Sequence, residues 1–143
     1  MRLRLIVLLA VIGVAVPAVA LASRSGTLKF EAYLSGKSEI PKAAPKGKAT
    51  VNITITGTKV CWKYTSVGGI DKPVVSHIHK GTATTASGPV VVPLGGKYAA
   101  SGCTATTAAI AGAIAKNPKG YYVNIHTAKY PNGAVRGQLH AGG

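Results

Sequence analysis

Four histidines are the residues whose type and spacing could support chemistry. His77 and His79 are two positions apart, while His126 and His140 follow much later in the chain. In a strand, residues i and i+2 point to the same face with Cα atoms about 7 Å apart. Both imidazoles could therefore converge on one ion with His126, and three neutral imidazoles suit zinc or copper. Alternatively, the three rings are interior residues that hydrogen-bond strands to loops, or they line a site for an organic ligand.

Asn124 and Arg136 are the polar residues nearest to this set in the C-terminal region. Either could bind an anion, and Arg136 beside the histidines would draw one toward them. Either could instead be structural, with Arg136 donating to loop carbonyls or pairing with Glu39. The general tendency of polar strand ends to satisfy backbone groups favours the structural role.

Hydrolytic machinery is not apparent in the sequence. The chain has three acidic residues in total, which leaves little for catalysis by paired carboxylates. No nucleophile elbow, P-loop or dinucleotide fingerprint occurs. A protein without catalytic activity is therefore expected, and an enzyme, if it is one, would be a metal-dependent redox protein.

Alternation of apolar and polar residues predicts the strands that must position these side chains. The clearest run is 49–56, which Gly57-Thr58 joins to 59–66 in a predicted hairpin. A second hairpin is predicted from 121–126 and 135–140, because the Tyr-Pro-Asn-Gly sequence between them favours a chain reversal. Tyr121, Val123 and Ile125 alternate with polar or larger neighbours, which indicates a half-buried strand with His126 at its end.

The remaining segments complete an all-β prediction. Strands are expected at 27–34, 74–80 and 89–94, with a loop of small residues at 81–88. The alanine-rich stretch 106–116 is the one expected helix, with Thr106 or Thr107 as its N-cap. Many short strands separated by turns indicate an antiparallel, Greek-key-like β-sandwich with at most one short helix.

Three blocks of sequence resemble the CHRD (chordin-type) domain family. They are Leu-Ser-Gly at 34–36 with Glu-Ile-Pro at 39–41, then SHIHKG at 76–81 followed by GPVVV at 88–92, and finally NIHTAKYPNGAVRGQL at 124–139. In this order they cover roughly residues 27–140. The resemblance implies a β-sandwich, and it implies that the strand end carrying His126 lies close to His77 and His79. It implies no single activity, because the family spans unlike proteins.

The histidine pattern is also similar to the copper ligands of copper-zinc superoxide dismutase, another Greek-key sandwich. The similarity covers His-x-His on one strand and a later histidine near a segment rich in glycine and arginine. The dismutase has a fourth copper histidine and a zinc site that contains an aspartate. Here His140 is the one spare histidine and Asp71 the sole aspartate, so the zinc site has no evident counterpart.

The N-terminus has the pattern of a secretory signal. Arg2 and Arg4 precede an apolar stretch that is too short for a membrane span, and Ala20-Leu21-Ala22 predicts cleavage before Ser23. The expected domains are therefore a signal peptide at 1–22 and one CHRD-type domain at 23–143. In such an exported protein, the even pair Cys61 and Cys103 predicts a disulfide.

Basic residues exceed acidic ones, with 17 Lys and Arg against 3 Asp and Glu. This surplus could attract anionic cell-envelope polymers or lipid headgroups, or it could simply keep the surface soluble. The lysines form no dense run, recognition helix or aromatic ladder, so no specific nucleic-acid binding is expected.

The sequence therefore predicts a secreted, extracytoplasmic CHRD-type module that binds a ligand or serves a structural role. The alternative is a copper- or zinc-binding protein whose His77, His79 and His126 have dismutase-like geometry. Metal content after purification without a histidine tag would separate the two.

Overall fold

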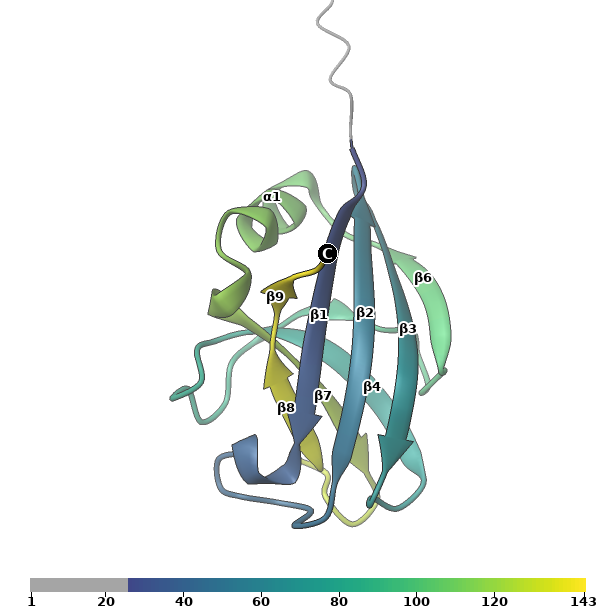
Figure 1. Cartoon of the computed structure of the whole chain (residues 1–143), viewed down its shortest axis with the longest axis vertical. Coiled ribbons are helices and arrows are strands. Elements are labelled where there is room, and N and C mark those ends of the chain that lie inside the picture. The colour runs from purple at the N-terminus through teal and green to yellow at the C-terminus, as the bar shows by residue number, and fades with distance from the viewer. Residues whose placement is uncertain (1–25) are drawn as a thin grey trace, which may run out of the picture.

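One antiparallel sheet forms the protein, and it folds back on itself into two packed layers (Figure 1). The computed structural model describes residues 26–143, so the predicted signal peptide at 1–22 lies outside the described residues. The sheet order is β5-β4-β7-β8-β1-β2-β3-β6, with β9 pairing to β1. The strands are β1 (Leu28–Ser35), β2 (Lys48–Thr56), β3 (Lys59–Gly68), β4 (Pro73–Lys80), β5 (Val90–Pro93), β6 (Ser101–Ala105), β7 (Tyr121–Thr127), β8 (Val135–Gln138) and β9 (His140–Ala141).

The segment between β5 and β6 closes most of the gap between the two ends of the sheet. Tyr98 N donates to Val74 O of β4 at 2.9 Å, and Tyr64 N of β3 donates to Ala100 O at 2.7 Å. These bonds connect β4 to β3, the strands next to the two ends of the sheet, through one segment, so the sheet resembles a nearly closed barrel. The all-β prediction with one short helix is confirmed.

The predicted hairpin of β2 and β3 is present, with one register shift between Thr50 and Val51. Thr56 pairs with Lys59 across the turn, where Gly57 has a φ of 59° that favours glycine. The apolar residues of β2 all face the core, and Val51, Ile53 and Ile55 are at most 1% exposed. They pack against residues from the opposite layer, including Ile78 of β4 and Val123 of β7. The hydrophobic core therefore lies between the layers.

The predicted helix is present as α1 (Ala108–Lys116), which covers one end of the sheet (Figure 1). Thr107 is its N-cap, and its side chain accepts a hydrogen bond from Ile110 N at 3.2 Å. Ala111 and Ile114 are its buried residues. Two 3₁₀ turns, η1 (Gly36–Ser38) and η2 (Pro118–Gly120), complete the elements. Among the described residues, no helix combines the length and apolar character needed to cross a membrane.

The predicted disulfide is confirmed. Cys61 of β3 and Cys103 of β6 occupy paired positions on neighbouring strands and are joined covalently. The bond closes a loop with a sequence separation of 42. It therefore fixes the edge strand β6 to the rest of the sheet.

One expectation about the C-terminal strands was wrong. β7 is not half-buried, because Tyr122 and Asn124 of its second face are 3% and 2% exposed. The loop at 81–88 accounts for this, since its Gly88 contacts the side chain of Tyr122. The chain also continues as a strand to Ala141 in β9, where His140 pairs with Glu31 of β1.

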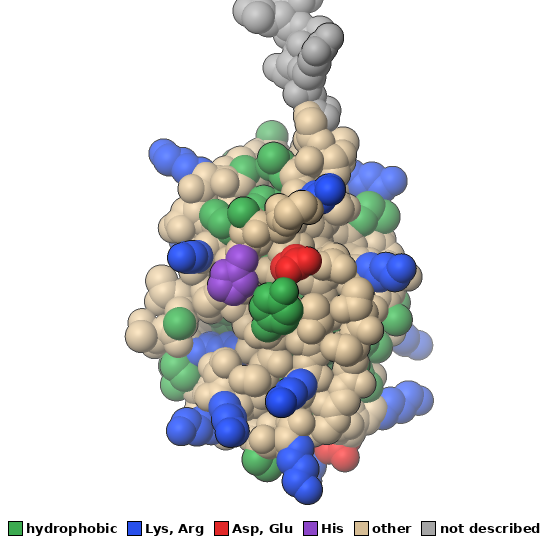
Figure 2. Space-filling view, viewed as in Figure 1, with side chains coloured by type: hydrophobic (Ala, Val, Ile, Leu, Met, Phe, Trp, Pro, Cys, Tyr) green, Lys and Arg blue, Asp and Glu red, His purple; other side chains and the backbone are tan. Residues whose placement is uncertain are grey.

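Positive side chains are spread over the surface without forming a dense run, and Figure 2 shows this on one face. The three acidic residues are Glu31, Glu39 and Asp71, and Glu39 is only 6% exposed. Arg136 is buried beside it, at 1% exposed, so the two buried charges offset each other and the surface keeps the basic surplus of the composition.

Candidate functional site

Three of the histidines meet on the outer side of β4 and β7. His77 and His79 lie on β4, with ring centroids 5.5 Å apart, and His126 lies near the end of β7. The register of the two strands pairs His126 with Val75. This places the ring centroid of His126 5.0 Å from the ring centroid of His77. One ligand nitrogen from each ring can be chosen so that all lie within 4.8 Å of one another.

A chain of hydrogen bonds fixes the protons of His126 and His77. His126 Nδ1 lies 2.8 Å from Pro131 O, and because a carbonyl only accepts, this nitrogen carries a proton. In the neutral ring, His126 Nε2 is then an acceptor, and His77 Nδ1 donates to it at 3.2 Å. This leaves the Nε2 of neutral His77 with a free lone pair. Both rings are partly buried.

His79 is the buried member of the cluster, 7% exposed, and its two nitrogens face two acceptors. Nδ1 is 2.7 Å from Gly88 O and Nε2 is 3.0 Å from Asn124 Oδ1. A neutral imidazole has one N–H, so it can donate only one of these bonds. Burial lowers the pKa of His79 and favours the neutral ring. The ring nitrogen without a proton keeps a lone pair. That lone pair can bind a metal, or it can accept a hydrogen bond from Asn124 once the Asn124 amide is flipped so that its NH2 faces the ring.

The pKa of His77 is lowered to about 4, first by burial and then by the nearby His126 and His79. Rings this close repel one another when charged, so protonating one of them disfavours protonating the next. At neutral pH His77 is therefore unprotonated at one nitrogen, which is the form that binds transition metals.

A column of stacked groups connects the cluster to Arg136. The ring of Tyr122 stacks on His79 with a 4.9 Å centroid separation and a 4° interplanar angle. The guanidinium of Arg136 lies over the same tyrosine ring, 4.8 Å from its centroid. The sequence alone did not single out Tyr122 as part of this region. The signal that could have found it is its place on the same strand face as Asn124 and His126.

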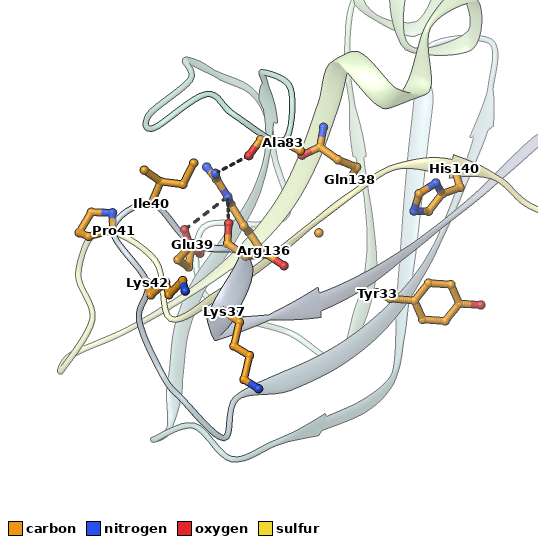
Figure 3. A pocket seen from close by; sticks show the side chains of 12 residues that line it. Tyr33, Lys37, Glu39, Ile40, Pro41, Lys42, Ala83, Arg136, Gln138 and His140 are labelled. Atoms are coloured by element: carbon orange, nitrogen blue, oxygen red, sulfur yellow. Dashed lines mark hydrogen bonds and ion pairs between the residues drawn. The ribbon is translucent and has the colours of Figure 1, made fainter.

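Arg136 is buried, at 1% exposed, and its guanidinium points to loop carbonyls (Figure 3). Nε donates to Ser38 O at 2.6 Å and Nη1 donates to Thr85 O at 2.7 Å. The carboxylate of Glu39 is 3.9 Å from Nε, a longer contact than either hydrogen bond. Arg136 therefore joins the end of η1 to the loop at 81–88.

Asn124 and Gln138 lie beside Arg136 in the same region. Asn124 of β7 pairs with Arg136 of β8 in the sheet. Gln138 Nε2 lies 2.8 to 3.1 Å from three carbonyls, those of Gly81, Lys119 and Tyr121, which its two N–H groups share. The β4–β5 loop, residues 81–88, is thus held by side chains from β4, β7 and β8.

Glu39 should make the folded protein less stable as the pH rises through neutrality. Burial raises its pKa to about 7, and the charge of Arg136 opposes the rise only in part. The folded state therefore holds a proton that the unfolded state releases above about pH 4.5. The contribution of this proton to the free energy of unfolding is fully present below pH 4.5 and is lost as the pH rises through 7.

Glu39→Gln tests this effect, because the amide stays neutral at every pH. We expect equal stability of variant and parent near pH 4.5, and an advantage of up to about 3 kcal/mol for the variant at pH 8 in urea unfolding. A difference that does not change with pH would contradict the prediction. Glu31→Gln is the matched control, since Glu31 of β1 is only partly buried and lies outside the contact between Glu39 and Arg136.

Comparison with known proteins gave one match. The family model of the CHRD domain matches residues 30–139, which is most of the chain. No curated protein and no solved structure matches it. The matched range contains all three histidines of the cluster, together with Asn124 and Arg136.

Proposed function

Because this chain belongs to the CHRD-domain family, we propose that it is an extracytoplasmic binding module whose histidine cluster binds one copper or zinc ion. His77 and His126 are the principal ligands and His79 is the third. The observation that carries this proposal is the 3.2 Å separation of His77 Nδ1 and His126 Nε2.

That separation is the one expected of two ligands on a single ion. With metal–nitrogen bonds near 2.0–2.1 Å, two nitrogens at tetrahedral or square angles lie about 2.9–3.4 Å apart. The Pro131 carbonyl that holds His126 Nδ1–H is the kind of outer partner that orients metal-binding histidines. A metal ion would take the place of the proton that His77 and His126 share.

His79 joins the ion by exchanging its contact with Asn124. One of its nitrogens belongs to the group of three ligand atoms that lie within 4.8 Å of one another, a spacing wider than that between ligands bound to one ion. Its contact with Gly88 O can persist, because that bond uses Nδ1 and leaves Nε2 for the ion. Asn124 then serves as a structural residue that holds the ring in place when no metal is bound.

Binding is favoured over superoxide dismutation by the composition of the cluster. Within residues 26–143, these histidines form the one group of three or more His, Cys, Asp or Glu side chains close enough to hold a metal. A separate zinc site beside the copper site, as in the dismutase, has no candidate there. The proposed role is therefore to carry or sequester a metal, or to use it structurally.

Export is supported by the disulfide and by the sequence of the leader. A bond between Cys61 and Cys103 persists in oxidising compartments and is rare in the cytosol. The leader pattern ending at Ala22 adds an independent reason to expect export.

The experiment is a metal titration of the exported, untagged protein after treatment with a chelator. We expect about one Cu²⁺ or Zn²⁺ per chain, with affinity that falls at low pH because protons compete for imidazole. His126→Ala and His77→Ala should each lose most of the binding, at least about tenfold in affinity. Isothermal titration and competition with a colorimetric chelator would both measure this.

His140→Ala is the matched control, because His140 lies on β9 outside the cluster and should leave metal affinity unchanged. The proposal fails if the parent binds no ion while the alanine variants are merely less stable, since the rings would then be hydrogen-bonding residues only. Rapid superoxide turnover by the copper-loaded protein would contradict the assignment as a binding module.

A further inference from the structure

A groove separate from the histidine cluster lies where β1, the chain after η1 and the β8–β9 segment meet (Figure 3). Its volume is about 630 Å³. Gly137 is part of its wall, and a Cβ at this position would collide with the backbone oxygen of Tyr33. β8 can therefore approach the β1 backbone closely here because residue 137 has no side chain.

An exposed aromatic ring stands at one end of the groove. Tyr33 is 64% exposed, the largest exposure among the large hydrophobic residues that solvent reaches in the described chain. Its hydroxyl donates to Glu31 Oε2 at 2.9 Å, which restrains the side chain. An exposed ring with a polar edge is suited to stacking against the C–H face of a sugar, because it offers apolar area without further ordering cost.

The other end of the groove is positively charged. Lys37 and Lys42 line it and are solvent exposed. The one acidic residue in its lining, Glu39, is buried and faces Arg136, so it adds little negative charge to the opening. Figure 3 shows the lysines on the side of the groove away from His140. Such an opening would attract an anionic group.

Hydrogen-bonding groups lie between the two ends. Both N–H groups of Gln138 are used by neighbouring carbonyls, while its Oε1 has no hydrogen-bond partner within residues 26–143. His140 is exposed and also lines the groove. These side chains could accept and donate hydrogen bonds to hydroxyl groups.

We propose that this groove binds an acidic polysaccharide, with a sugar ring stacked on Tyr33 and its carboxylates beside Lys37 and Lys42. The arrangement combines an aromatic surface, hydroxyl-binding groups and positive charge, which matches the chemistry of a uronic acid polymer. A lipid surface fits less well, because only Tyr33 and Ile40 of the exposed large hydrophobic residues line the groove. This inference is independent of the metal proposal.

The test is binding of polygalacturonate to the full exported protein with a chelator present, so that the metal site has no influence. Biolayer interferometry or fluorescence anisotropy would give Kd. We expect Tyr33→Ala, and separately the pair Lys37→Ala with Lys42→Ala, to weaken binding by about tenfold or more. Tyr33→Phe should retain near-parental affinity, because the ring remains.

The matched control is the pair Lys63→Ala with Lys97→Ala. These exposed lysines lie on β3 and in the segment after β5, outside the groove, and their loss changes net charge equally. We expect less than about a threefold effect, with the salt dependence of binding largely retained. All these positions are exposed, so the variants should fold.

Two comparison ligands complete the test. Neutral dextran should bind much more weakly than polygalacturonate, and vesicles containing phosphatidylglycerol should bind no better than neutral vesicles. The proposal is overturned if polygalacturonate does not bind, if both lysine pairs weaken binding equally, or if anionic vesicles bind more tightly than the polysaccharide. The equal-weakening result would mean that attraction depends on net charge alone.

Discussion

Arg136→Ala is expected to lower the free energy of unfolding by about 3–5 kcal/mol, because several partly buried carbonyls and the buried Glu39 lose their partner at once. The side chain is 1% exposed and donates to the carbonyls of Ser38 and Thr85. Without it those carbonyls lose their partner, and Glu39 loses its ion-pair contact. Denaturant unfolding at pH 7 measures the loss.

The loss of stability should also be local. The β4–β5 loop should lose amide hydrogen-exchange protection at residues 81–88, while the β2–β3 hairpin keeps its protection. Arg136→Lys should be nearly as damaging as alanine, since one ammonium cannot reproduce the guanidinium's bonds to two loops. Most of the loss should persist in a Glu39→Gln background, because the contact to Glu39 is longer than those to the carbonyls.

Gln138→Ala provides the matched comparison. It also removes a donor to several loop carbonyls, but its side chain is neutral and only partly buried. We expect a cost of about 1–2 kcal/mol. If Arg136→Ala lowers the free energy of unfolding no more than Gln138→Ala does, Arg136 is not the main side chain that stabilises these loops.

Opening the disulfide by Cys61→Ala with Cys103→Ala should cost about 4 kcal/mol, because the bond closes a long loop in the unfolded chain. In a domain of this size the melting temperature should fall by roughly 10–20 °C. The edge strand β6 should lose hydrogen-exchange protection before β2 and β3 do, since it pairs on one side only.

Mass spectrometry of the exported parent provides the matching measurement. The chain should begin at Ser23, and its mass should be two hydrogens below that of the reduced form. Free labelling of both cysteines in the native exported protein, or a retained leader, would contradict the expectation. Unchanged stability in the double variant would mean that the bond does not constrain the unfolded chain appreciably.

Much of the fold follows from local sequence patterns. The period-two run in β2, the glycine turn after it and the alanine-rich stretch with Thr107 before it each specify a local structure. The pairing of the two cysteines followed from the sequence, because an exported chain with two cysteines can form only one intramolecular disulfide. The shared face of His77 and His79 followed from strand geometry alone.

The approach of His126 to His77 depended on the tertiary structure, since the two residues are 49 positions apart. Only the register of β4 against β7 sets their distance, and a one-residue slip would turn His126 to the other face. The resemblance to a known family predicted the proximity. The shared hydrogen bond and the role of Pro131 needed the folded chain.

The hydrogen-bond partners of the buried polar side chains could not be predicted from the sequence. Arg136 and His79 bond to backbone carbonyls of Ser38, Thr85 and Gly88, and every residue carries such a carbonyl. No side-chain pattern can therefore identify the acceptor before the loops are placed. The same holds for the second face of β7, whose burial depends on a distant loop, and for the groove, whose walls come from both ends of the chain.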